Sequence, residues 1–432
     1  MADQTTTIPK GWKMTTLGEV VEITSSKRIF ADEYKKSGIP FFRGKEITEK
    51  FSGNEISTEL FISDEKYEEI KNKYGVPEEN DILLTSVGTL GNPYLVEKGL
   101  KFYFKDGNLT WFHNYKGIYP KFLYYWITSP QGKESLSYAK IGSTQEAYTI
   151  AKLKVLSCII PPLPEQRAIA AVLSSLDDKI ELLREQNKTL EAIAQAIFKE
   201  WFVKFNFPNS EGKPYKASGG TMIDSELGDI PEGWRVGRLT EIFDFMEGPG
   251  IRNWQYTETG RRFINIRLIQ NSDIDIKNAN FISLEEAEGV YKHFNLEEKD
   301  MVVSTSGTLG RSAIVRKEHL PLMLNTSVIR FRPIDRISYG FMYQFLNSRF
   351  FQNELLSMAS GSVQLNFGPV HLKQIKMVIP NEKILQLYAK IANSLYIKIS
   401  NNFSQIQTLS TLRDTLLPKL MKGEIRVKGF GE

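Results

Sequence analysis

Two long segments of the chain carry apolar residues at alternating spacings of four and three. The first series comprises Ile169, Leu173, Leu176, Ile180, Leu183, Asn187, Leu190, Ala194, Ile197 and Trp201. The second comprises Tyr388, Ala392, Leu395, Ile399, Asn402, Ile406, Leu409, Arg413, Leu416 and Leu420. This heptad pattern predicts two long helices, each with one apolar seam that packs against another helix.

Each seam holds one asparagine near its middle, at Asn187 and Asn402. If the helices pair antiparallel with these two residues opposite each other, Trp201 meets Tyr388 and every other partner also falls on a seam position. A buried Asn pair is a known device for fixing helix register at some cost in stability. We therefore expect Asn187 and Asn402 to set the register of an antiparallel coiled coil.

The chain also repeats itself. Asp81–Gly91 recurs as Asp300–Gly310, an offset of 219 residues, and Gly142-Ser143-x-Gln145 recurs as Gly361-Ser362-x-Gln364 at the same offset. The opening Ile8-Pro9-Lys10-Gly11-Trp12 recurs as Ile230-Pro231-Glu232-Gly233-Trp234. Blocks in the same order at near-constant offset indicate two whole modules, each a globular part followed by a helical part.

Between the openings and the seams, short apolar or alternating runs predict strands. Examples are Ile39–Arg43, Asp81–Thr85, Met301–Ser304 and Val328–Phe331. One amphipathic segment in each half, Pro120–Thr128 and Tyr339–Asn347, predicts a helix. The expected fold class is α+β: two mixed, mostly β domains, separated by two long helices that form an antiparallel coiled coil, with pseudo-twofold symmetry.

A loop rich in hydroxyls and glycines follows a predicted strand in each half, at Thr85–Gly91 and Ser304–Gly310. Such residues let a backbone approach a phosphate closely and donate hydrogen bonds to it. Neither loop has the Gly-Lys-Ser/Thr ending of a nucleotide-binding P-loop, and a tight turn between strands is the alternative interpretation. The candidate DNA contacts in these loops are Thr85, Ser86, Thr89, Ser304, Thr305, Ser306 and Thr308.

Basic and amide side chains near the predicted strand ends are further candidates. Arg43, Lys45 and Arg267 can contact guanine edges or phosphates. Gln suits bidentate reading of adenine, and one Gln stands in each repeated Gly-Ser-x-Gln block. The candidates in these blocks are Ser143, Gln145, Ser362 and Gln364.

Composition narrows the class of protein. The 432 residues are too many for one core. A net charge of +4 means that any positive surface must be local. The single Cys158 excludes an intramolecular disulfide, and its apolar surroundings predict a buried thiol. No signal pattern and no apolar run of about 20 residues are present, so we expect a cytoplasmic protein without a membrane partner.

Several motifs together resemble the specificity (S) subunit of Type I restriction–modification enzymes. They are the repeated Ile-Pro-x-Gly-Trp openings, Pro-Pro-Leu-Pro-Glu-Gln-Arg at 161–167, Thr-Leu-Glu-Ala-Ile-Ala-Gln-Ala-Ile-Phe-Lys at 189–199, Phe-Pro-Asn-Ser-Glu-Gly-Lys-Pro-Tyr in the segment between the halves, and Leu-Leu-Pro-Lys-Leu-Met-Lys-Gly-Glu-Ile at 416–425. The resemblance covers nearly the whole chain. The second helix departs from it, because Pro380-Asn-Glu-Lys replaces the pattern at 161–167.

The resemblance implies a domain organisation. It comprises target recognition domain 1 (1–160), conserved helical region 1 (161–204), a linker (205–229), target recognition domain 2 (230–380), and conserved helical region 2 with the tail (381–432).

The resemblance also implies a function. Each recognition domain would read one half of a bipartite site in double-stranded DNA. The helices would set the spacer length and dock two modification (methyltransferase) subunits, which restriction/translocase subunits would join. This chain would hold no catalytic residue, metal or cofactor. S-adenosylmethionine, ATP and Mg would belong to the partner subunits, whose complex would methylate adenine and cleave DNA with ATP. The alternatives are a coiled-coil scaffold without direct DNA reading and an enzyme that acts alone.

Overall fold

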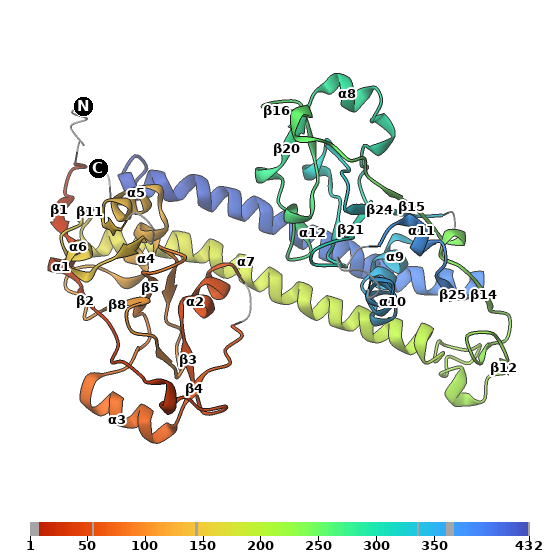
Figure 1. Cartoon of the computed structure of the whole chain (residues 1–432), viewed down its shortest axis with the longest axis horizontal. Helices are drawn as coiled ribbons and strands as arrows, with labels where there is room; N and C mark the ends of the chain where they lie inside the picture. The colour runs from red at the N-terminus through yellow and green to blue at the C-terminus, as the bar shows by residue number, and fades with distance from the viewer. Residues whose placement is uncertain (1–7, 54–55, 143–145, 335–336, 360–366, 431–432) are drawn as a thin grey trace. The chain divides into compact units, whose positions relative to one another are not determined.

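The computed structural model describes residues 8–53, 56–142, 146–334, 337–359 and 367–430 (Figure 1). The chain divides into two compact units. Unit 1 comprises residues 1–179 and 409–432, and unit 2 comprises residues 180–408. Two long helices, α7 (Leu163–Phe198) and α12 (Glu382–Lys422), each contribute one part to unit 1 and the other part to unit 2.

Unit 1 is built around a four-stranded antiparallel sheet of order β2-β8-β5-β6. A three-stranded sheet, β4-β3-β7, and the pairs β1-β11 and β9-β10 accompany it. The strands are β1 (Lys13–Thr16), β2 (Glu22–Thr24), β3 (Ile39–Phe42), β4 (Phe61–Ile62), β5 (Ile82–Thr85), β6 (Pro93–Leu95), β7 (Tyr103–Phe104), β8 (Leu109–His113), β9 (Lys140–Ile141), β10 (Ala147–Tyr148) and β11 (Ser157–Ile160). The helices are α1 (Leu17–Val20), α2 (Gly44–Phe51), α3 (Asp64–Tyr74), α4 (Pro120–Thr128), α5 (Pro130–Tyr138) and α6 (Ile150–Lys154).

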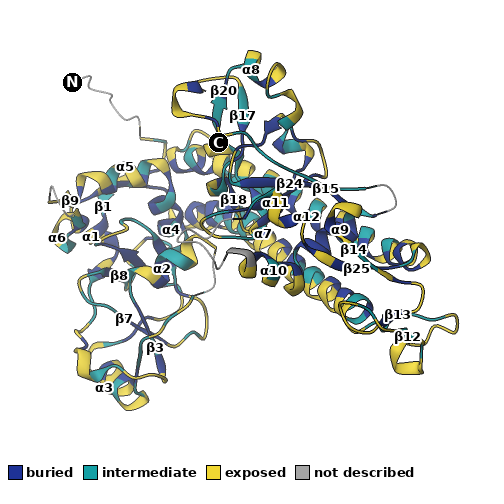
Figure 2. Ribbon diagram, turned by 45° about the vertical axis from the view of Figure 1, so that its right-hand side comes forward, coloured by how far each residue is buried: buried dark blue, intermediate teal, exposed yellow. Residues whose placement is uncertain are grey.

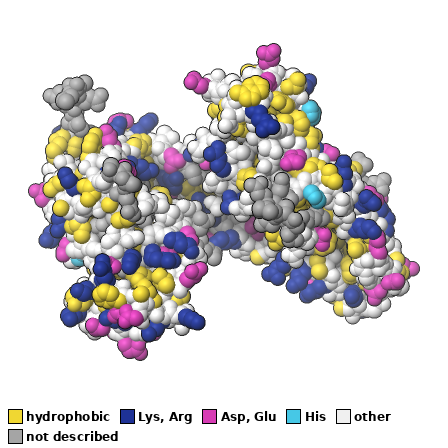
Figure 3. Space-filling model, in the orientation of Figure 1, with side chains coloured by type: hydrophobic (Ala, Val, Ile, Leu, Met, Phe, Trp, Pro, Cys, Tyr) yellow, Lys and Arg dark blue, Asp and Glu magenta, His cyan; other side chains and the backbone are white. Residues whose placement is uncertain are grey.

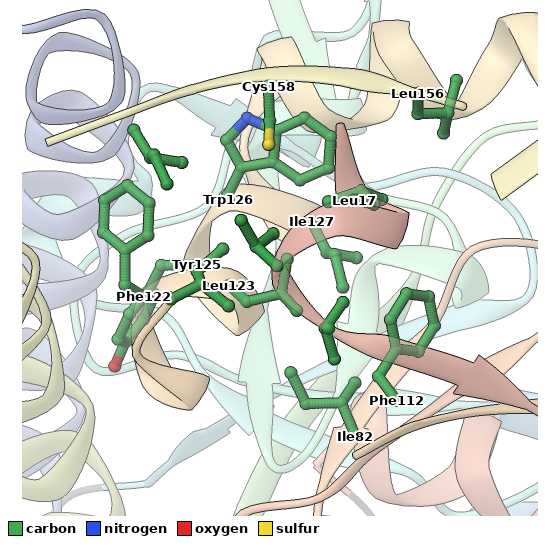
Figure 4. Packing of buried hydrophobic residues seen from close by; sticks show 14 of the residues in the cluster. Leu17, Ile82, Phe112, Phe122, Leu123, Tyr125, Trp126, Ile127, Leu156 and Cys158 are labelled. Atoms are coloured by element: carbon green, nitrogen blue, oxygen red, sulfur yellow. The ribbon is translucent and has the colours of Figure 1, made fainter. Parts of the chain in front are cut away.

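Unit 1 has two core clusters, one around β3, β4 and β7 and another where α4 packs against the four-stranded sheet. Trp126 and Phe122 of α4 pack with Leu17 of α1 and Cys158 of β11 (Figure 4). Cys158 is 3% exposed, and burial raises the pKa of its thiol to about 12. This confirms the buried thiol that the apolar run predicted.

Unit 2 repeats the strand orders of the two sheets of unit 1, with β16 as an additional strand in the second sheet. Its four-stranded sheet is β15-β24-β21-β22, its second sheet is β16-β20-β17-β23, and β14 pairs with β25 as β1 pairs with β11. The strands are β12 (Met222–Ile223), β13 (Ile230–Pro231), β14 (Arg235–Arg238), β15 (Phe243–Glu247), β16 (Tyr256–Thr257), β17 (Arg261–Phe263), β18 (Ile269–Gln270), β19 (Asp273–Ile274), β20 (Asn280–Ile282), β21 (Met301–Ser304), β22 (Ser312–Ile314), β23 (Leu322–Met323), β24 (Val328–Pro333) and β25 (Lys376–Ile379). The helices are α8 (Leu284–Glu288), α9 (Tyr339–Leu346), α10 (Arg349–Ala359) and α11 (Pro369–Leu372). The α+β class and the repeat are therefore confirmed.

The long helices run antiparallel within each unit. In unit 1, Ile169 and Leu173 of α7 share a core cluster with Leu417 and Leu420 of α12. In unit 2, Trp201 stacks edge-on against Tyr388 with ring centroids 5.4 Å apart. Every predicted seam position is buried or half-buried, and exposed residues occupy the outer faces of the helices (Figure 2). The α-helical geometry of α7 ends at Phe198, and Lys199–Val203 form a π-helical turn that includes Trp201.

The segment 205–229 is packed rather than extended. Phe207 is 4% exposed and stacks on two rings. Its ring centroid lies 4.9 Å from that of Trp234 and 4.6 Å from that of Tyr215. The segment that we expect as a linker thus packs its aromatic side chains against Trp234, within the same unit.

Candidate nucleic-acid interface

Loops gather at one end of the four-stranded sheet in each unit. In unit 2 the antiparallel register places Ser304, the last residue of β21, opposite Val328, the first residue of β24. In unit 1 it places Thr85, the last residue of β5, opposite Leu109, the first residue of β8. The hydroxyl loop that follows β5 or β21 therefore lies beside the loop that precedes β8 or β24.

Four of the predicted hydroxyl contacts lie below the surface. Thr85, Ser86, Ser304 and Thr305 are each at most 1% exposed. The Thr85 hydroxyl accepts from the Asn92 amide at 2.9 Å, and the Ser304 hydroxyl donates to the Thr308 carbonyl at 2.6 Å. These side chains hold the shape of their own loops, and burial keeps them from a phosphate in this conformation.

The other loop hydroxyls reach the surface. Thr89 and Thr308 are exposed at equivalent places, and Ser306 is half-buried. Each tip turns at a glycine in the left-handed region, Gly88 with φ of 80° and Gly307 with φ of 65°. Glycine adopts this conformation without the strain that a side chain brings, which explains why both copies carry it.

The three basic side chains predicted to contact DNA differ in whether an acidic partner holds them. Arg43 caps the start of α2 and pairs with the buried Glu46 carboxylate at 2.7 Å, an interaction that raises the pKa of its guanidinium. Lys45 lies on the same helix and pairs with Glu49 at 3.6 Å. Arg267 is exposed in the 3-10 turn Ile266–Leu268. Arg43 lies near the hydroxyl loop, because the next residue, Gly44, approaches the Thr85 methyl group and the Val87 carbonyl.

The four residues of the Gly-Ser-x-Gln blocks lie outside the described residues. They are Ser143, Gln145, Ser362 and Gln364. Their contact with DNA stays a prediction.

Sequence reasoning missed a segment that, in both units, is hydrogen-bonded to the stretch of chain leading to β8 or β24, which in turn is bonded to the hydroxyl loop. In unit 2 the Pro249 carbonyl accepts from Thr326 at 2.9 Å, and the next residue, Ser327, accepts from the Thr305 amide at 2.9 Å. Gly248 allows this approach, since a Cβ there would lie 2.5 Å from the Asn325 backbone.

In unit 1 the equivalent segment follows β2. The Ser26 hydroxyl donates to the Phe104 carbonyl at 2.8 Å, and the nearby Asn108 carbonyl accepts from the Ser86 amide at 2.8 Å. We call residues 25–33 and 248–255 the strand-end segments. The repeat aligns them, but their side chains differ, so no shared sequence motif marks them.

Figure 3 shows Lys and Arg side chains over the lobe of unit 1 that holds β3, β4 and α3, interspersed with acidic ones. Charges of both signs therefore cover this lobe, and the picture shows no large surface of one sign there.

A buried arginine ties the globular part of unit 2 to α12. The Arg316 guanidinium pairs with Asp273 at 2.6 Å, donates to Gln407 at 3.1 Å, and lies over the Phe403 ring. The His319 side chain is fully buried, and its Nε2 lies 3.3 Å from the carboxylate of the same aspartate. Phe403 and Gln407 belong to α12, so the group fixes the recognition part against that helix.

The two asparagines meet as the heptad pattern predicted. The Asn402 side-chain amide donates to the Asn187 side-chain carbonyl at 2.8 Å, and both residues are at most 4% exposed. The second amide and the second carbonyl of this pair are buried and have no hydrogen-bond partner in the described part of the chain. The pair is therefore a costly polar layer within an apolar seam.

Within the residues that the structure describes, no cluster of three or more His, Cys, Asp or Glu is arranged to hold a metal ion. No helix there combines the length and apolar character needed to cross a membrane.

The chain matches known proteins along both repeats. The family model described as Type I restriction modification DNA specificity domain matches residues 9–192 and again 231–409. The Type I restriction enzyme MjaIX specificity subunit of Methanocaldococcus jannaschii is 29% identical, over 98% of this chain and 95% of that protein. The HindI specificity subunit of Haemophilus influenzae is 25% identical, over 71% of this chain and 78% of its own length.

A solved structure shares the fold. The S subunit of a Type I restriction–modification system from M. genitalium superposes with a TM-score of 0.55 at 19% identity. The match covers 97% of this chain and 98% of that one.

Proposed function

The chain belongs to the Type I restriction–modification DNA specificity family, and from this premise we propose that it is the non-catalytic subunit that selects the DNA site. Each repeat reads one half of a bipartite site in double-stranded DNA. The observation that carries this proposal is the duplicated interface. In both units an equivalent backbone hydrogen bond joins the hydroxyl loop to the loop that precedes β8 or β24. The strand-end segment adjoins that second loop, through its backbone in unit 2 and through serine side chains in unit 1.

Within each interface, backbone and hydroxyl groups serve the phosphates. Thr89, Ser306 and Thr308 reach the surface of the loops, where a phosphate can accept their hydrogen bonds. The exposed Arg267 is free to read base edges or to bind phosphates in unit 2.

The helix pair carries the second part of the proposal. We propose that the Asn187–Asn402 layer fixes the helix register and thereby the spacer length. The helices dock two modification subunits, which hold S-adenosylmethionine, and restriction subunits that use ATP and Mg join them. The assembled complex methylates adenine and cleaves DNA.

The test begins with the complete chain assembled with its modification subunits. Mapping methylated adenines in genomic DNA gives both half-sites and the spacer. Competition between cognate duplexes and duplexes altered in one half-site then measures specificity, and altered half-sites should cost about 10³-fold or more. Equal binding to all sequences would reject the proposal.

The scaffold alternative predicts a different result. A coiled-coil scaffold without DNA contact shows no dependence of affinity on salt. Several phosphate contacts instead give a steep fall of log affinity with log salt concentration. Turnover by the purified chain alone would favour the lone-enzyme alternative.

A further inference from the structure

Each strand-end segment carries an exposed aromatic ring. In unit 2 the ring is Trp254, which is 80% exposed, and in unit 1 it is Phe30, which is 61% exposed. A single exposed apolar side chain needs no explanation by itself. These two call for one because they lie at equivalent 3-10 turns of the two repeats. Trp254 is the second residue of its turn, and Phe30 directly precedes its turn.

Side-chain hydrogen bonds hold the turn in unit 2. Trp254 lies within the turn Asn253–Gln255, whose last residue is 8% exposed. The Gln255 side chain accepts from the Arg252 amide at 3.0 Å and donates to Glu286 at 2.6 Å and to the Tyr291 hydroxyl at 3.2 Å. A ring held on such a turn loses little conformational entropy when it binds.

The turn in unit 1 is held in the same way. The Phe30 amide donates to the Glu33 carboxylate at 2.8 Å, three residues on, as in unit 2. That carboxylate pairs with Lys66 of α3 at 2.9 Å. Different side chains thus fasten one backbone turn in both repeats.

The charges around Trp254 favour a nucleic acid as the occupant. Arg252 and Asn253, both exposed, directly precede Trp254, and the segment 248–257 has no acidic residue. Around Phe30 the charges are mixed. Lys27 and Arg28 precede the ring and Arg28 pairs with Asp106, whereas Asp32 and Glu33 follow it. Cations beside an aromatic ring suit a surface where phosphates flank stacked bases.

We propose that Phe30 and Trp254 are wedges that insert at a base step of duplex DNA, one beside each half-site. This inference rests on the proposed function. Apolar side chains inserted between base pairs unstack them and bend the duplex. Each ring would thus make the neighbouring step easier to distort, and the cations beside it would hold the flanking phosphates.

The experiment uses the full chain assembled with its modification subunits and a cognate duplex carrying 2-aminopurine at successive positions. Its fluorescence rises where a base loses its stacking neighbour. We expect one bright step beside each half-site in the wild type. Trp254→Ala should abolish the bright step beside the half-site that unit 2 reads, and Phe30→Ala should abolish the bright step beside the other half-site. Trp254→Phe should keep the step that Trp254→Ala abolishes. Each alanine variant should bind about 5- to 100-fold more weakly.

Leu284→Ala is the matched control, because Leu284 is 57% exposed in the same unit and should leave both steps bright. Bright steps and full affinity in Trp254→Ala overturn the wedge. So does loss of subunit assembly in Trp254→Ala, measured by sedimentation, since it would assign the ring to a protein contact. Neither result touches the proposed function, whose separate readout is the preference for cognate over altered half-sites.

Discussion

The two repeats keep one aspartate before the same strand but give it different partners. Asp81 precedes β5 and accepts from the Trp111 indole at 2.8 Å, whereas Asp300 precedes β21 and pairs with the Arg332 guanidinium. Each carboxylate also accepts a hydrogen bond from the backbone amide of the residue three positions earlier. Asp81 accepts from Glu78 at 2.9 Å, and Asp300 accepts from Glu297 at 2.7 Å.

Both repeats keep the backbone hydrogen bond of this aspartate, but they differ in its side-chain partner. The backbone amide that each aspartate accepts is common, so it belongs to the fold. The side-chain partner is neutral in unit 1 and charged in unit 2, and burial raises the pKa of the Asp81 carboxyl to about 6. Duplication thus preserved the turn while the electrostatics of the two copies diverged.

The largest difference should come from removing Arg316. Arg316→Met leaves Asp273 without its guanidinium, and breaking a buried ion pair costs about 3–5 kcal/mol of unfolding free energy. Its equivalent in the first repeat is Glu97, whose side chain is 56% exposed and pairs with Lys50. Glu97→Gln should change stability by about 0.5 kcal/mol or less. Urea unfolding with hydrogen exchange measures both, and equal effects would contradict the anchoring role of Arg316.

The aspartates should respond oppositely to amide substitution. The pKa of the Asp81 carboxyl is about 3.9 in the unfolded chain, and burial raises it to about 6 in the folded chain. The contribution of this carboxyl to the unfolding free energy is therefore fully present below about pH 4 and is lost as the pH rises through 6. Asp81→Asn should therefore stabilise the protein at pH 7 by up to about 3 kcal/mol and have little effect near pH 4.

Asp300→Asn weakens the pairing with Arg332 and should destabilise at pH 7 by about 2 kcal/mol. Urea midpoints at several pH values check both variants. A stabilising Asp300→Asn would show that the guanidinium does not compensate for burial of the carboxylate.

Replacing the asparagine layer should have a smaller effect and should stabilise the protein. Asn187→Leu with Asn402→Leu removes two buried unpartnered atoms and should raise the unfolding free energy by about 1–2 kcal/mol. We expect methylation to tolerate other spacer lengths, because the register is no longer fixed. If the double variant gains stability yet keeps one spacer length, the register role is wrong. Adding Leu183→Asn and Ile406→Asn should restore selectivity.

The smallest effects should come from the exposed loop hydroxyls. Thr89→Ala and Thr308→Ala each remove one phosphate hydrogen bond and should weaken duplex binding by about 0.5–1.5 kcal/mol for all sequences alike. Fluorescence anisotropy with cognate and altered duplexes measures this. A loss confined to the cognate sequence would instead assign base reading to that threonine.

The sequence predicted the regular elements well where periodicity was strong. The helix Pro120–Thr128 and the strand Met301–Ser304 have the predicted bounds, and the heptad seams predicted the Asn187–Asn402 contact. Heptad spacing works because the position of a residue along a helix determines the face on which it lies.

The candidate site was less predictable, because composition does not reveal side-chain direction. Thr85 and Thr89 belong to one hydroxyl-rich loop, yet the first is buried and the second exposed. No sequence pattern singled out Arg316, because its partners Asp273 and Gln407 lie far away in sequence. Only the folded chain brings such groups together.

The asparagine layer does not map onto itself under the repeat. Asn187 is equivalent to Ile406, and Asn402 to Leu183. If α7 associated with an α7 from another molecule in this geometry, Asn187 would face Leu183, and each such mismatch leaves a buried amide that costs about 1–3 kcal/mol. Association of α12 with its own copy meets the same penalty against Ile406. The polar layer thus disfavours homodimers and keeps each helix bound to its partner within one chain.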